Sequence, residues 1–229
     1  MIPFLILVLF FQLLPENDFE EIFGTKYSFA LKEMRSLNPQ IDSLAETYEL
    51  DAELMAATVF PEFIRYSIVR DIIEINSLEI VYVNTGMADF SIGPLQIKPS
   101  FAEKIEQIVI NEKYLEKYRN NFQYYTENSI EIRKERVRRL KSAPTQLQYI
   151  AVFQKYMYHK FPFLRYKSKY YQLKFLSTAY NSGFQSPRKE IEARMDGKYF
   201  PWGIFNEKKK YNYSEIAWYF YRREYSANQ

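Results

Sequence analysis

The chain contains no cysteine and only one histidine among its 229 residues. Without cysteine it can form no disulfide and carry no lipid on a cysteine side chain, which excludes a bacterial lipoprotein. A single histidine, His159, makes neither a histidine-based metal site nor a histidine-containing catalytic triad convincing, so we treat it as structural. The sequence also lacks internal repeats and low-complexity tracts.

Aromatic and apolar residues are abundant. Hydrophobic residues make up 47% of the chain and aromatic residues 18%, including 21 tyrosines. This composition favours a globular protein over a disordered one, and the length suffices for one well-buried core. We therefore expect a single domain over residues 16–229. Tyrosines in excess of what a core needs are expected at the surface, where they either stack on sugars or lie half-buried with the hydroxyl in water.

An apolar run, MIPFLILVLFFQLL, occupies residues 1–14 and is followed by the polar residues PEND. It is too short to span a bilayer comfortably and fits the hydrophobic region of a secretory signal. No basic residue precedes it and no small-x-small cleavage site follows it. Residues 1–15 are therefore predicted to be a signal peptide or an N-terminal anchor, with a buried N-terminal helix as the alternative.

Charge is distributed unevenly along the chain. Residues 1–100 contain 6 Lys or Arg and 15 Asp or Glu, a net charge of −9, whereas residues 101–229 contain 25 and 13, a net charge of +12. Such asymmetry suits an anionic envelope partner on the basic C-terminal half, although a solvated helix face explains it more simply. The basic run at 133–141 includes a glutamate and accompanies no glycine-rich or zinc-finger pattern, so we expect no nucleic-acid partner.

Helical periodicity dominates the sequence and predicts a mainly α fold. The segment LEIVYV at 78–83 reads either as a helix end or as a short strand. We therefore expect at most a short β element between residues 78 and 92.

The segment DAELMAATVFPEF at 51–63 is predicted to be an apolar helix with Asp51 as its N-cap. It ends in a carboxylate, Glu62, among apolar neighbours. Because a carboxylate removed from water responds with a raised pKa, Glu62 is a candidate proton donor at neutral pH. The alternative is an ordinary solvated carboxylate at a helix end. Pro61 predicts a kink or termination at 57–61, with Glu62 just past the bend.

Two further segments suit a cleft shared with Glu62. In DFSIGPLQIKP, at 89–99, one glycine and two prolines predict a loop that carries a single uncharged amide, Gln96. In STAYNSG, at 177–183, a helix is predicted to end at Gly183.

Together these segments resemble a known family. YELDAEL at 48–54 leading to Glu62, then GPLQIKP at 93–99, then AYNSG at 179–183 are similar to the three ordered motifs of lytic transglycosylases and goose-type lysozymes. The resemblance spans roughly residues 40–185 and implies a lysozyme-like fold. The family usually has a serine directly after the catalytic glutamate, where this chain has Phe63. Ser67 and Ser91 are the candidates to replace that hydroxyl.

The resemblance also implies a function: cleavage of the peptidoglycan glycan strand between N-acetylmuramic acid and N-acetylglucosamine. Glu62 would act as the general acid and then as the base, and neither cofactor nor metal is required. The implied substrate-binding residues are Ser91, Gly93, Gln96, Tyr180 and Asn181. Gln96 and Asn181 would bind acetamido groups, Tyr180 would hold the sugar or orient Glu62, and the backbone of 91–93 would complete the floor.

Several alternatives remain at this point. A hydrolytic goose-type mechanism would use a second carboxylate, for which Asp89 is the best candidate. A non-catalytic glycan-binding protein or a structural envelope protein would keep the fold without the chemistry. In every case we expect a monomer that is exported to the periplasm or the cell exterior.

Overall fold

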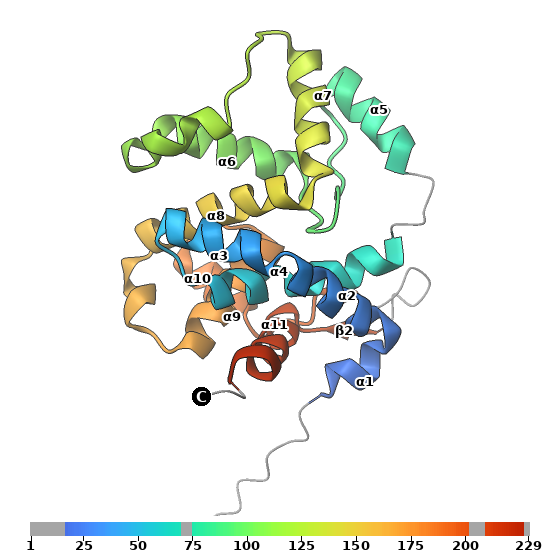
Figure 1. Cartoon of the computed structure of the whole chain (residues 1–229), viewed down its shortest axis with the longest axis vertical. Helices are drawn as coiled ribbons and strands as arrows, with labels where there is room; N and C mark the ends of the chain where they lie inside the picture. Colours follow the sequence, from blue (N-terminus) through green and yellow to red (C-terminus); the bar gives the residue numbers. More distant parts are fainter. Residues whose placement is uncertain (1–16, 70–74, 202–208, 227–229) are drawn as a thin grey trace, which may run out of the picture.

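The structure is a computed structural model that describes residues 17–69, 75–201 and 209–226 (Figure 1). The predicted signal peptide or anchor, residues 1–15, lies outside the described residues. The helices are α1 (Phe19–Phe23), α2 (Thr25–Ser36), α3 (Asn38–Tyr48), α4 (Ala52–Val69), α5 (Ile75–Thr85), α6 (Pro99–Asn111), η1 (Lys113–Asn121), α7 (Ser129–Leu140), α8 (Ala143–Lys160), η2 (Pro162–Tyr166), α9 (Lys169–Ser182), α10 (Arg188–Arg194), α11 (Tyr213–Tyr221) and the π-helical turn η3 (Arg222–Ser226). The predicted mainly α fold is confirmed.

The β structure within the described residues is small and lies away from the expected place. Two-residue strands, β1 (Phe200–Pro201) and β2 (Lys210–Tyr211), pair antiparallel. Residues 78–83, where a short strand was the alternative to a helix, belong to α5. Their β-branched side chains favour a strand only weakly, because such preferences depend on tertiary context. In α5 that context is the packing of Tyr82, which is 1% exposed, beside α7. An isolated bridge joins Ile92 to Ile97.

Helix α4 is the central element of the core. Every residue from 54 to 64 is buried, and α4 packs against α2, α3, α9 and α11. A helix that is apolar all round has no solvent face, so it must be surrounded by others. Its N-terminus is as predicted: Asp51 accepts a hydrogen bond from the Leu54 N–H at 2.9 Å.

Of the kink or termination predicted at 57–61, the termination is wrong, because α4 continues through Pro61 to Val69. A proline within a helix removes one backbone hydrogen bond and costs about 3 kcal/mol. Tertiary packing offsets this cost, since the chain on both sides of Pro61 is buried. Glu62 therefore lies inside α4 and not beyond a termination at Pro61.

Two groups of helices meet across α8. Helix α7 contacts α5, α6 and α8, while α8 also contacts α3 and α4. In Figure 1, α5, α6 and α7 lie at one end of the molecule, and α2, α4, α9 and α11 lie beyond α8. The loop from residue 86 to 98 connects α5 to α6 and returns to the boundary between the groups.

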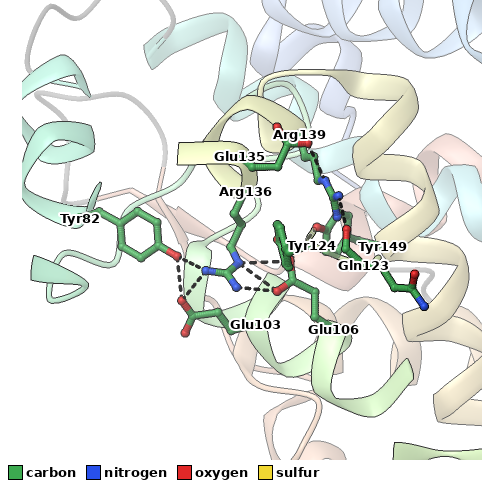
Figure 2. A network of polar contacts seen from close by, with 9 residues as sticks. All are labelled: Tyr82, Glu103, Glu106, Gln123, Tyr124, Glu135, Arg136, Arg139 and Tyr149. Carbon is green, nitrogen blue, oxygen red and sulfur yellow. Dashed lines mark hydrogen bonds and ion pairs between the residues drawn. The ribbon is translucent and has the colours of Figure 1, made fainter. Parts of the chain in front are cut away.

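A buried polar network connects the helices of the group formed by α5, α6 and α7 (Figure 2). Arg136 of α7 binds both carboxylate oxygens of Glu106 and also donates to Glu103 and to the Tyr82 hydroxyl, at distances of 2.6–3.1 Å. The Tyr124 and Tyr149 hydroxyls donate to the same Glu106 carboxylate. Every member of such a network needs its partners, because an unpaired buried charge is strongly destabilising.

The basic run on α7 is largely occupied by intramolecular contacts. Arg133 donates to backbone carbonyls of α5, Arg136 belongs to the buried network, and Arg138 and Arg139 both bind Glu135. Helix α7 therefore offers less free charge to an anionic partner than its sequence suggests. No described helix is both long and apolar enough to cross a membrane.

Candidate functional site

A groove of about 400 Å³ opens where the loop before α6 meets α4 and the C-terminal end of α9. Six of the seven sequence-predicted site residues line it: Glu62, Asp89, Ser91, Gln96, Tyr180 and Asn181. Its volume is within the range of about 300–1,000 Å³ common for small-molecule sites. Three segments that are distant in the sequence thus converge on one cavity.

Glu62 is the buried acid of this groove. Its side chain is 4% exposed, and burial raises the pKa of its carboxyl group. The Arg65 guanidinium, the Tyr213 hydroxyl and the Lys98 charge oppose this effect without cancelling it. The acid therefore stays protonated to a higher pH than an exposed glutamate, as proton donation requires.

The raised pKa also makes Glu62 a cost to folding. Between the unfolded-state pKa, 4.5, and the higher folded-state pKa, the folded protein binds more protons than the unfolded chain. The contribution of Glu62 to the free energy of unfolding is therefore fully present below pH 4.5 and is lost as the pH rises through the folded-state pKa. Each unit of difference costs about 1.4 kcal/mol at higher pH.

Arg65 lies one helical turn after Glu62. Its Nη1 is 3.1 Å from Glu62 Oε2 and 3.4 Å from Oε1. The Oε2 contact does not have hydrogen-bond geometry, so this buried oxygen is held mainly by charge. The guanidinium carbon is also 4.8 Å from the centre of the Phe200 ring, which fixes the arginine from the β1 side.

Tyr213 of α11 is a second partner of Glu62. It is 3% exposed, its hydroxyl donates to the Thr58 carbonyl at 3.2 Å, and it also lies within hydrogen-bond reach of the Glu62 carboxyl group. One hydroxyl proton cannot serve both acceptors. The hydroxyl lowers the pKa of Glu62 because it can donate to the ionised carboxylate, and it can donate to Thr58 when Glu62 is protonated.

Residues 91–97 form a tight turn that is stabilised by a side chain of α8. Ile92 and Ile97 exchange two backbone hydrogen bonds, at 3.0 and 3.1 Å. The side-chain amide of Gln146 then joins the loop on both sides, accepting from the Leu95 N–H at 2.8 Å and donating to the Ile92 carbonyl at 2.6 Å. A fully buried amide with both groups satisfied holds the turn rigidly.

Gln96 is displayed by this turn in a strained conformation. Its φ is +51°, and its Nε2 donates to the Gly93 carbonyl at 2.9 Å. Within the described ranges, Oε1 accepts no hydrogen bond, so it can accept one from an amide N–H of a ligand.

Gly93 is the predicted site residue that does not line the groove. Its φ is +66°, and a Cβ built on it would lie 2.2 Å from the Leu140 carbonyl oxygen and 3.0 Å from Gln146. Glycine is needed here because the loop packs directly against the end of α7. Gly93 therefore allows the loop to pack closely against α7 without itself lining the groove.

Tyr180 joins the α9 motif to the loop. Its hydroxyl donates to the Leu95 carbonyl at 2.6 Å, and its pKa is raised well above the ordinary value by burial and by the nearby Glu62. The Tyr180 hydroxyl proton is therefore already used in a hydrogen bond to the loop. Asn181, the next residue, lines the groove, and α9 ends at Gly183 with φ +113°, as predicted.

The remaining candidates, Asp89, Ser67 and Ser91, differ in whether their side chains are available to a ligand in the groove. Asp89 accepts from the Ser100 N–H and hydroxyl at 3.1 and 3.0 Å and lies 3.8 Å from Lys98. Its carboxylate thus serves the first turn of α6. The Ser67 hydroxyl is buried and donates to the Ile64 carbonyl, so of the two candidate serines only Ser91 reaches the groove.

Sequence reasoning missed Arg65 and Tyr213. A signal existed for Arg65, because residues three apart on a helix face each other. None existed for Tyr213, which comes from a helix outside the motif-bearing region. In the described part of the chain, no group of three or more His, Asp or Glu side chains is arranged to hold a metal ion.

The geometry defines a site with one buried carboxylic acid, a displayed amide and an asparagine on a shared groove. Comparison of the chain with protein-family models, with curated proteins and with solved structures finds no match.

Proposed function

We propose that this protein is a lytic transglycosylase that cleaves the glycan strand of peptidoglycan between N-acetylmuramic acid and N-acetylglucosamine. The observation that carries the proposal is the convergence of Glu62, Gln96 and Tyr180 on one groove. The motif resemblance supplies the reaction, and the burial of Glu62 supports its role as the acid. This substrate requires that the protein act in the periplasm or outside the cell.

In the first step Glu62 donates its proton to the glycosidic oxygen, and the bond between that oxygen and C1 of the muramic acid breaks. The resulting carboxylate then takes the proton of the C6 hydroxyl of the same sugar. The C6 oxygen bonds to C1, an anhydro ring forms and Glu62 regains its proton. No water is consumed, so a second carboxylate is not needed.

The substrate is held by amides rather than by charge. Gln96 Oε1 would accept from an acetamido N–H, and the Asn181 amide would bind a second acetamido group. Tyr180 acts indirectly, because its hydroxyl holds the loop that displays Gln96. Asp89 is the second carboxylate for a hydrolytic mechanism, and its hydrogen bonds to Ser100 favour a role in capping α6.

The test is digestion of purified peptidoglycan by the wild type and by Glu62→Gln, with the soluble products identified by mass spectrometry. We expect anhydro-muropeptides from the wild type and a loss of roughly 10²–10⁴-fold in Glu62→Gln, the size of a general acid–base contribution. The matched control is Glu46→Gln, which changes an exposed glutamate on α3.

Each other outcome has a defined meaning. Reducing ends in place of anhydro ends indicate a lysozyme-type hydrolase, and then Asp89→Asn is also inactive. Retention on insoluble peptidoglycan without cleavage indicates a glycan-binding protein. Equal activity of the wild type and Glu62→Gln rules out Glu62 as the acid.

A further inference from the structure

The reaction proposed above asks Glu62 to occupy two charge states in one turnover. It must begin as a carboxylic acid and then exist as a carboxylate until the C6 proton arrives. An apolar pocket supports the first state and penalises the second, because a buried unpaired carboxylate is costly. A site built only to raise the pKa would therefore slow the second half of the reaction.

Arg65 is the cation placed to relieve this conflict. Its Nη1 is within 3.1–3.4 Å of both Glu62 oxygens, and its side chain is 24% exposed at the groove while that of Glu62 is 4% exposed. Within residues 17–69, 75–201 and 209–226, no other cation lies within ion-pair distance of Glu62. A guanidinium remains charged at any physiological pH, so it can serve throughout the cycle.

The remaining groups that face Glu62 cannot replace it. Tyr180 from α9 and Tyr213 from α11 are neutral hydroxyls whose pKa values are raised by burial. Lys98 from the loop acts at longer range and lies 3.8 Å from Asp89. The charged side chains that lower the pKa of Glu62 are Arg65 and, to a smaller extent, Lys98.

We propose that Arg65 is a positioning residue of the transglycosylase reaction: it holds the Glu62 carboxyl group at the groove and stabilises the carboxylate between proton donation and proton return. The inference rests on the proposed function and adds a residue that the motif resemblance does not supply. The family's serine after the glutamate is Phe63 here, which is 1% exposed in the core, so a polar partner must come from elsewhere. The Phe200 ring lies 4.8 Å from the guanidinium carbon and supports it from the β1 side.

The experiment compares the pH dependence of kcat and KM on peptidoglycan for the wild type, Arg65→Met, Arg65→Gln and Arg65→Lys. Removing the positive charge raises the pKa of Glu62, so the acid form persists to higher pH. We therefore expect the basic limb of kcat/KM to move to higher pH in both neutral variants. We also expect kcat to fall by up to roughly 100-fold with little change in KM. Arg65→Lys should restore much of both properties.

The matched control is Lys98→Met, which removes a more distant groove cation and should shift the basic limb less than Arg65→Met. The neutral variants would overturn the proposal if their pH profiles coincided with the wild type, or moved no further than that of Lys98→Met. Should one neutral variant fail to fold, the other and Arg65→Lys decide the matter. A wild type that does not cleave peptidoglycan overturns both proposals, whereas a cleaving wild type with unmoved profiles overturns this one alone.

Discussion

Replacing Arg136 by methionine is expected to be the most destabilising single change in the helices behind the groove. The substitution keeps most of the side-chain volume but leaves Glu106, whose side chain is 6% exposed, without its cation. Of the described hydrogen-bond partners of Glu106, the Tyr124 and Tyr149 hydroxyls would then remain. Breaking a buried ion pair in this way costs about 3–5 kcal/mol.

This loss is large relative to the whole. Domains are stable by about 5–15 kcal/mol, and 1 kcal/mol shifts the melting temperature of a chain of this size by about 2–4 °C. We therefore expect Arg136→Met to lower the melting temperature by roughly 6–20 °C, measured by circular dichroism at neutral pH. The double variant Arg136→Met with Glu106→Gln should recover part of the loss, because the stranded charge is gone.

The control comes from the same helix. Arg138 also binds a carboxylate, Glu135, but its side chain is 76% exposed, and its replacement by methionine should leave the melting temperature unchanged within error. Equal melting temperatures for Arg136→Met and Arg138→Met would refute the view that the network in Figure 2 holds α6, α7 and α8 together. Because the end of α7 abuts Gly93, Arg136→Met should also weaken substrate cleavage through the displaced loop.

Three further predictions concern the groove itself. Gly93→Ala should destabilise the fold by about 1–3 kcal/mol because of its positive φ, and a clash with Leu140 should add to this cost. Gly24 has a similar φ but open space around it, so Gly24→Ala is the control that lacks the clash. Urea unfolding of both variants measures the difference. Tyr213→Phe should cost about 1 kcal/mol of stability, and it should move the basic limb of kcat/KM to higher pH because the hydroxyl that lowers the pKa of Glu62 is removed. An unmoved limb would exclude the contact. Glu62→Gln should melt at a higher temperature than the wild type at pH 7, because the cost of ionising a buried glutamate is removed. Thermal scans at lower pH should show this gain disappear as the pH approaches 4.5. A gain that persists at pH 4.5 would contradict a raised pKa of Glu62.

Local signals in the sequence were enough for the ends of elements. Asp51 before an apolar helix and Gly183 after one act through contacts within four residues of themselves, and both are found where predicted. The glycine and prolines of 89–99 likewise predict a loop, and a loop is present up to Lys98, with Pro99 as the first residue of α6. These features depend on backbone chemistry that neighbouring residues already determine.

Packing decided what local signals could not. Pro61 is a helix breaker by propensity, yet α4 continues because the chain on both sides of it is buried. Residues 80–83 are β-branched or aromatic, yet they belong to α5, where Tyr82 packs beside α7. The role of Tyr213 beside Glu62 depends on how α11 crosses α4, which no pattern near either residue encodes.

The groove is also where the chain departs most from its own local preferences. Within the described residues, Glu49 and Gln96 are the non-glycine residues with positive φ. Glu49 forms the C-cap of α3, which explains its conformation, but Gln96 caps no helix. Its side chain donates to the Gly93 carbonyl, and Gln146 accepts from the N–H of the neighbouring Leu95. Strain of this kind persists only where surrounding structure over-determines it, and it concentrates at functional sites. The buried acid and the strained amide line the same groove, so two independent costs to folding share one location, as expected if function rather than stability selected them.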